Sequence, residues 1–134
     1  ISDSPKKTFW HGHSFTANPL GCAAANASLD LLEKDPIKYL SFEEKHLSHL
    51  KKIKKLPFVK NIRVTGTIAA FDIEIGKNEG YLNNVGKRIK ALSIKKGLFI
   101  RPLGNVIYLL PPLCITDNQL EKSYRIIFEI LSDL

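Results

Sequence analysis

The residues best suited to chemistry lie in a polar loop near the start of the chain. The loop, His11-Gly12-His13-Ser14-Phe15-Thr16-Ala17-Asn18-Pro19, runs into a helix start, because Asn is a preferred N-cap and Pro a preferred first helical residue. The free N–H groups and positive dipole end of such a helix favour a phosphate or a carboxylate. The hydroxyls of Ser14 and Thr16 add donors. We therefore predict an anion site at this loop.

Arg101 is the second candidate, because it interrupts an apolar run over residues 97–104 that holds no other charge. A guanidinium keeps its proton, so a buried arginine has to meet an anion. The following Pro102 biases Arg101 toward extended backbone. Residue types alone favour an internal Asp or Glu partner, or an edge-strand side chain that reaches water, over a ligand.

Other pairs of polar residues give weaker signals. His11-x-His13 and His46-x-x-His49 have spacings found in metal sites, but no cluster of Asp, Glu or Cys accompanies them, so we expect no metal site. Asp72 and Glu74 alternate on one strand face and could be paired carboxylates for acid–base work. The polar face of an edge strand is the simpler interpretation.

The candidate residues must be positioned by helices and short strands, which alternate along the chain. Apolar residues at three-to-four spacing predict helices over about 19–34, 36–55 and 81–96, and a last one after a capping box at residues 116–119. Runs of period two predict strands over 59–64, 68–75, 98–102 and 106–110. Gly66 is expected to turn between the first two strands, and Gly97 to end the third helix. The order predicts an α+β domain, with helices on one face of a small, mainly antiparallel sheet.

The small and apolar faces of the helices predict how they pack. The small residues of the first helix predict close packing against a neighbour. For the second helix, the predicted apolar side consists of Ile37, Leu40, Leu47, Leu50 and Ile53.

Composition excludes several classes of protein. The 134 residues, 44% of them hydrophobic, suit a globular domain, and no apolar run approaches the roughly 20 residues that span a bilayer. The net charge of +7 comes mainly from scattered lysines, densest at residues 51–55, without interleaved arginine or aromatic residues. That pattern is typical of a solvated helix face and not of a nucleic-acid site.

The cysteines and the first residues bear on the compartment and the extent of the chain. Cys22 and Cys114 are expected to be buried thiols without a disulfide, which favours a cytoplasmic protein. The chain begins with Ile1, contains no Met and has no apolar signal region. It is therefore expected to be the downstream piece of a longer protein.

The opening loop resembles that of the class III aminotransferases, which are pyridoxal-phosphate enzymes of fold type I. Their pattern His-Gly-x-Thr-Phe/Tyr-x-x-Asn-Pro supplies a hydroxyl to the cofactor phosphate, and Ser14 keeps that hydroxyl where the family usually has Thr. The resemblance implies that His13, through its main chain, and Ser14 hold the phosphate of pyridoxal 5'-phosphate. It also implies that the backbone of Gly12 approaches the substrate.

The block from Ile100 to Pro112 resembles the substrate-arginine motif of the biotin-pathway branch of that family. There the arginine binds the carboxylate of the keto acid that receives the amino group. The resemblance implies this role for Arg101, since its bidentate fork fits a planar carboxylate in a way that lysine cannot. It further implies S-adenosylmethionine as the amino donor.

The resemblance covers the whole chain but only the C-terminal third of such an enzyme. It implies that residues 1–19 lead in from a missing large domain as the phosphate loop, and that residues 20–134 form the C-terminal small domain. The lysine that carries the cofactor would lie upstream, so no residue here is assigned as catalytic and this piece alone should be inactive. The loop would serve the neighbouring subunit, which implies a homodimer.

Two alternatives remain open at this point. One is another class III aminotransferase, of the omega-amino acid type for example, with a different donor or acceptor. The other is a non-catalytic α+β module that uses the loop and Arg101 to bind a small anion.

Overall fold

The computed structural model describes residues 4–7, 12–34, 41–75 and 84–134. The chain falls into two units, Ile1–Pro36 and Ile37–Leu134, each described here by itself. The first helix belongs to the same unit as the opening loop. The assignment of the chain to a C-terminal small domain stays a prediction.

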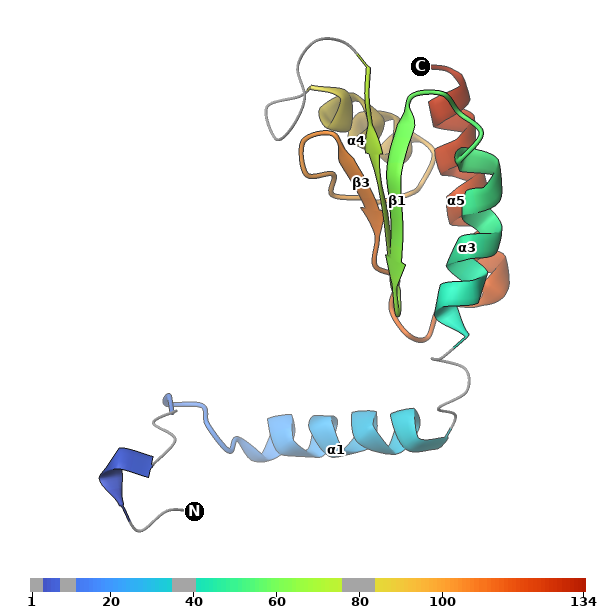
Figure 1. Cartoon of the computed structure of the whole chain (residues 1–134). Helices are drawn as coiled ribbons and strands as arrows, with labels where there is room; N and C mark the ends of the chain where they lie inside the picture. The colour runs from blue at the N-terminus through green and yellow to red at the C-terminus, as the bar shows by residue number, and fades with distance from the viewer. Residues whose placement is uncertain (1–3, 8–11, 35–40, 76–83) are drawn as a thin grey trace. The chain divides into compact units, whose positions relative to one another are not determined.

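The first unit contains a short 3-10 helix, η1 (Pro5–Lys7), and the helix α1 (Pro19–Lys34), shown in Figure 1. The bounds of α1 are those predicted. No residue of α1 is buried, and Leu20, the most exposed of its leucines, is 81% exposed. The prediction of close packing is not met within the first unit. Cys22 is exposed, so the prediction of a buried thiol there is wrong.

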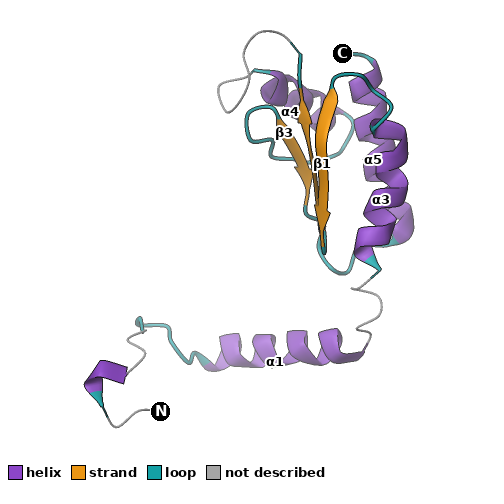
Figure 2. Ribbon diagram, viewed as in Figure 1, coloured by secondary structure: helices purple, strands orange, loops and turns teal. Residues whose placement is uncertain are grey.

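The second unit is built on a three-stranded antiparallel sheet, ordered β1 (Val59–Thr65), β2 (Ile68–Ile73), β3 (Val106–Leu109) (Figure 2). The helices are α3 (Phe42–Ile53), α4 (Val85–Lys95) and α5 (Asp117–Ser132). Pairing of Phe71 with Ile107 sets the register that directs these two side chains into the core. The predicted α+β architecture is confirmed.

Within the described residues of the second unit, the helices cover one face of the sheet. The core cluster joins Phe71 and Ile107 to residues of all three helices, among them Leu50, Ile89 and Ile127. The opposite face carries exposed charged side chains such as those of Lys60 and Arg63. This alternation is the burial pattern expected of an antiparallel sheet with one solvated face.

Local sequence signals fix the ends of several elements. Gly66 has φ +55° in the turn between β1 and β2, as predicted. Gly97 (φ +77°) ends α4 in a Schellman motif, because its N–H donates to the carbonyl of Ile94 and the N–H of Leu98 donates to that of Ser93. The predicted starts of α3 and α4, at residues 36–40 and 81–83, and the predicted loop at 76–80 lie outside the described residues.

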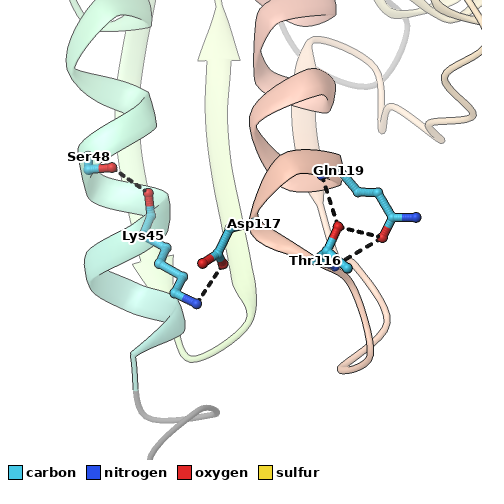
Figure 3. Close-up of polar contacts among 5 residues, drawn as sticks. All are labelled: Lys45, Ser48, Thr116, Asp117 and Gln119. Carbon is cyan, nitrogen blue, oxygen red and sulfur yellow. Dashed lines mark hydrogen bonds and ion pairs between the residues drawn. The ribbon is translucent and has the colours of Figure 1, made fainter.

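The predicted capping box begins α5 (Figure 3). The N–H of Gln119 donates to Oγ1 of Thr116 at 3.3 Å, and the N–H of Thr116 donates to Oε1 of Gln119 at 3.0 Å. At the first residue of α5, Lys45 of α3 reaches Asp117, with Nζ 2.7 Å from Oδ1. These contacts tie the start of α5 to its own cap and to the neighbouring helix.

Three further predictions are corrected in this unit. Residues 98–102 do not form a strand, since only Leu103 bridges Val106 and Pro102 has no N–H for a ladder. Leu47 is 50% exposed, and the buried stripe of α3 is Phe42, His46, Leu50 and Ile53. Cys114 is exposed and not buried.

Among the described helices, none has the length and apolarity needed to cross a bilayer.

Candidate functional site

The opening loop is a pair of consecutive turns that leads into α1. The N–H of Thr16 donates to the carbonyl of His13 at 2.9 Å, and the N–H of Asn18 donates to that of Phe15 at 3.2 Å. Ala17 has φ +60°, a left-handed conformation that turns the chain toward the helix. Oδ1 of Asn18 accepts from the N–H of Leu20 at 3.1 Å, which is the predicted N-cap bond.

His13 has a structural role inside this loop. Its main-chain N–H donates to Oγ1 of Thr16 at 2.8 Å, and its ring Nδ1 accepts from the N–H of Phe15 at 3.2 Å. The side chain therefore helps to close the turn, a role that no sequence pattern indicates. Because the N–H of His13 is engaged by Thr16, the main-chain phosphate contact expected of His13 stays a prediction.

Ser14 differs from its neighbours in the loop. It is exposed, and neither its N–H nor its hydroxyl makes a hydrogen bond with the residues that the structure describes. Gly12 is also exposed, and no described atom lies within 4 Å of the position a Cβ would take. Two donors at Ser14 and open space at Gly12 are thus available to a ligand.

Arg101 lies in the second unit, between the end of α4 and the turn before β3. Its side chain is exposed and forms no ion pair with the described carboxylates, so the internal Asp or Glu partner that residue types favoured is not present there. The residue borders a pocket of about 380 Å³. The pocket walls are mostly apolar and come from residues 98–100, 108–112, 115 and 120.

The composition of this pocket defines what it can bind. Arg101 is its one charged residue among the described lining, beside the hydroxyl groups of Tyr108 and Ser123. An unpaired guanidinium at an apolar wall suits a carboxylate joined to an aliphatic or carbonyl-bearing chain.

Gly12, His13 and Ser14 belong to the first unit and Arg101 to the second. Each group is placed within its own unit. Their assembly into one site stays a prediction, as does each of the four binding roles.

The carboxylate pair Asp72 and Glu74 and the histidine pair that includes His11 were the other candidates from the sequence. Asp72 is on β2, the central strand and not an edge, and its Oδ1 lies 2.9 Å from Nη1 of Arg63 while its Oδ2 accepts from Nδ2 of Asn61 at 2.8 Å. This engagement leaves Asp72 in a structural ion pair. Glu74 is exposed just beyond the strand. His11 lies outside the described residues, among which no group of three or more potential metal ligands occurs.

His46 is a buried polar residue whose position the sequence analysis missed. Its Nε2 lies 3.0 Å from the carbonyl of Thr67 and its Nδ1 lies 2.6 Å from the hydroxyl of Tyr124. A carbonyl can only accept, so Nε2 carries the proton and the neutral ring accepts from Tyr124 at Nδ1. The signal was its place in the helical series Phe42, His46, Leu50, which marks the core face of α3.

Burial explains the electrostatics of this cluster. Desolvation is the main cause that lowers the pKa of His46 below 6.5, and the bond to Thr67 opposes it only in part. Desolvation also lowers the pKa of His49, whose ring stacks on that of Tyr124 with centroids 4.9 Å apart. Burial raises the pKa of the Tyr124 hydroxyl. The cluster is therefore neutral at pH 7 and joins α3 to α5.

Comparison with known proteins places these features in context. The family model described as aminotransferase class-III matches residues 2–131. The chain is 46% identical over 133 residues to an adenosylmethionine-8-amino-7-oxononanoate aminotransferase of Synechococcus elongatus, covering 99% of this chain and 31% of that protein. It is 42% identical over 127 residues to the protein of the same name from Geobacter sulfurreducens, covering 86% of this chain and 27% of that protein.

Solved structures agree with the sequence relatives. The crystal structure of adenosylmethionine-8-amino-7-oxononanoate aminotransferase from Methanocaldococcus jannaschii matches with a TM-score of 0.80 at 30% identity, over 94% of this chain and 30% of that one. The chain thus spans about a third of the length of the relatives it matches.

Proposed function

Because this chain belongs to the class III aminotransferases, we propose that its parent protein is a pyridoxal-phosphate enzyme that moves an amino group from S-adenosylmethionine to 8-amino-7-oxononanoate. The product would be 7,8-diaminononanoate, and the pathway biotin biosynthesis. The observation that carries the proposal is the environment of Arg101. Its guanidinium forms no ion pair with a carboxylate of the described residues, and it borders an apolar pocket. The names of the relatives that are 46% and 42% identical support the same substrates.

Arg101 would bind the carboxylate of the acceptor. Its planar guanidinium can donate two parallel hydrogen bonds to one carboxylate, and the apolar wall beside it would contact the acceptor's hydrocarbon chain. This contact would orient the keto group relative to the rest of the site without taking part in proton transfer. We therefore assign Arg101 to substrate binding and not to catalysis.

The opening loop would hold the cofactor. Phosphate requires hydrogen-bond donors, and Ser14 offers both its N–H and its hydroxyl, neither of them used by described residues. His13 keeps its proposed main-chain contact, for which its N–H would have to leave Thr16. Gly12, where no described atom is near a Cβ, would let the substrate approach the backbone. The residues present fit the cofactor phosphate.

Bound pyridoxal phosphate supplies electron withdrawal from the carbon that carries the amino group. The lysine that holds the cofactor, and the acidic partner of its ring nitrogen, are expected in the part of the parent outside these residues. We further propose that the parent is a cytoplasmic homodimer in which this loop completes the active site of the neighbouring subunit.

The proposal is tested on the full-length parent with the cofactor bound. Incubation with S-adenosylmethionine and 8-amino-7-oxononanoate should give 7,8-diaminononanoate, measured by mass spectrometry. Parallel reactions contain glutamate or alanine as the donor. Product from those donors and none from S-adenosylmethionine would instead identify another class III aminotransferase.

A further inference from the structure

The start of α4 touches the turn that follows Arg101. Gly86, the second residue of α4, is buried, and a Cβ added to it would lie 2.0 Å from the carbonyl oxygen of Gly104 and 2.9 Å from Cβ of Pro102. A Cβ atom essentially never comes this close to an atom that is not bonded to it. The nearest atom belongs to the backbone, so no side-chain rotation could relieve the clash.

Helix formation alone does not explain this glycine. Within a helix, glycine is less favourable than alanine by roughly 1 kcal/mol, so the local preference at position 86 is for alanine. The close approach of the turn is therefore the feature of the molecule that requires glycine there.

The turn itself is stiff. Leu103 and Val106 exchange both main-chain hydrogen bonds, at 2.9 and 3.0 Å, and Gly104 has φ +62° as a type II′ hairpin turn requires. The buried Asn105 fixes the turn to β2, since its carbonyl accepts from the N–H of Ile73 at 2.9 Å and its Nδ2 donates to the carbonyl of Ile73 at 3.3 Å. The turn is held between α4 on one side and β2 on the other.

Arg101 precedes this turn directly and depends on it for its position. The ring of Pro102 fixes one of the two backbone torsions that join Arg101 to the turn. Phe99, on the other side of Arg101, lies under Nζ of Lys90 of α4, 5.9 Å from the ring centroid. The guanidinium has no ion pair with described residues, so the position of the Arg101 backbone sets the region that the side chain can reach.

We infer that Gly86 is a positioning residue for the substrate carboxylate: its missing side chain lets the turn at residues 102–105 seat against α4, and this seating places Arg101. The inference rests on the proposed role of Arg101. A Cβ at residue 86 would displace the turn by more than about 1 Å, and misplacement on that scale can cost up to roughly a hundredfold in activity.

The test compares Gly86→Ala with Gly66→Ala in the full-length enzyme carrying its cofactor. Gly66 also occupies a turn, with φ +55°, but no described atom lies within 4 Å of its Cβ position, so this variant reports general destabilisation. Each variant is assayed with the keto acid and with its carboxamide, which lacks the negative charge. We expect Gly86→Ala to raise KM for the keto acid roughly tenfold, with kcat within about twofold and kcat/KM for the carboxamide unchanged.

Equal losses with both acceptors, a loss matched by Gly66→Ala, or an unchanged KM would overturn the inference. Arg101→Lys is measured alongside: if it leaves KM for the keto acid unchanged, the proposed function of Arg101 fails, whatever Gly86→Ala does. Thermal unfolding reports whether Gly86→Ala folds. If Gly86→Ala does not fold, Asn105→Ala tests the inference instead. This variant loosens the attachment of the turn to β2, so it should raise KM for the keto acid and leave the carboxamide reaction unchanged.

Discussion

The ring of His46 on α3 and the hydroxyl of Tyr124 on α5 are joined by a hydrogen bond of 2.6 Å inside the core. The opposite ring nitrogen donates to the carbonyl of Thr67 at the turn between β1 and β2. One neutral imidazole thus links two helices and the sheet. Protonation would place a second donor against Tyr124, whose hydroxyl hydrogen would then need another acceptor.

The stability of the chain should therefore depend on pH through His46. Burial lowers its pKa in the folded chain below 6.5, so the unfolded chain takes up the proton first. The free energy of unfolding is highest above that pH and decreases as the pH falls below it, until the folded ring also titrates. Thermal unfolding measured from about pH 7.5 down to about pH 5 should show a falling Tm.

The matched variant is His46→Gln, which can donate and accept but does not titrate. This variant should be less stable near neutral pH than the unmutated chain. Its free energy of unfolding should also depend less on pH. His49→Gln is the control for the second histidine of α3, whose pKa is also lowered by burial. If Tm falls equally steeply with pH in the unmutated chain and in His46→Gln, His46 is not the source of the pH dependence.

Arg101→Lys in the full-length parent should weaken binding of the keto acid by about 1–3 kcal/mol, the scale of a lost charge-assisted bidentate contact. Lysine keeps the charge but cannot reproduce the fork. The measurement is KM for the acceptor, with KM for the amino donor as the internal control. If KM for the acceptor is the same in Arg101→Lys and in the unmutated enzyme, Arg101 does not bind the acceptor's carboxylate.

Ser14→Ala should loosen the cofactor more than the substrate, because it deletes the free hydroxyl proposed to donate to the phosphate. The cofactor retained after dialysis is measured by absorbance and compared with the parent. Ser14→Thr, which restores the residue usual in the family, should retain as much cofactor as the parent. Equal retention in the alanine variant would rule out the phosphate contact.

Thr116→Ala should destabilise α5 by about 1 kcal/mol, the usual cost of losing a threonine N-cap. This variant loses the bond from the N–H of Gln119 to Oγ1 of Thr116, while the main-chain N–H of residue 116 can still donate to Oε1 of Gln119. The expected result is a Tm lower by roughly 3–6 °C. Ser132→Ala, which removes a bond to the carbonyl of Phe128 at the other end of the helix, should change stability by less than about 0.5 kcal/mol.

The fold could be predicted where a signal is local. Asn18 and Pro19 mark the start of α1, Thr116 and Gln119 cap α5, and Gly66 and Gly97 end elements at positive φ. Each of these signals depends on residues within a few positions in the chain. Periodicity and caps therefore predicted the described α-helices, the three strands and the class of fold, but also a strand over residues 98–102 that does not form.

What the sequence could not supply depends on distant partners. His46 is buried because Tyr124 and Thr67, 78 and 21 residues away, satisfy its two nitrogens. The run around Arg101 has strand-like residues, yet pairing stops at Leu103. Gly86 shows no local signal at all, since its reason is a contact with Gly104. Of the candidate site, the residue types were predictable, and their surroundings were not.

The bulge in β1 has a consequence for association of the domain. Pairing with β2 shifts between Lys60 and Arg63, and Asn61 sits there with φ +48° while its carbonyl accepts from Nη1 of Arg63 at 2.7 Å. The outer border of the sheet is therefore kinked and partly occupied by its own side chain. A strand at this edge that is bent and has an irregular register disfavours the addition of a strand from a second copy at β1.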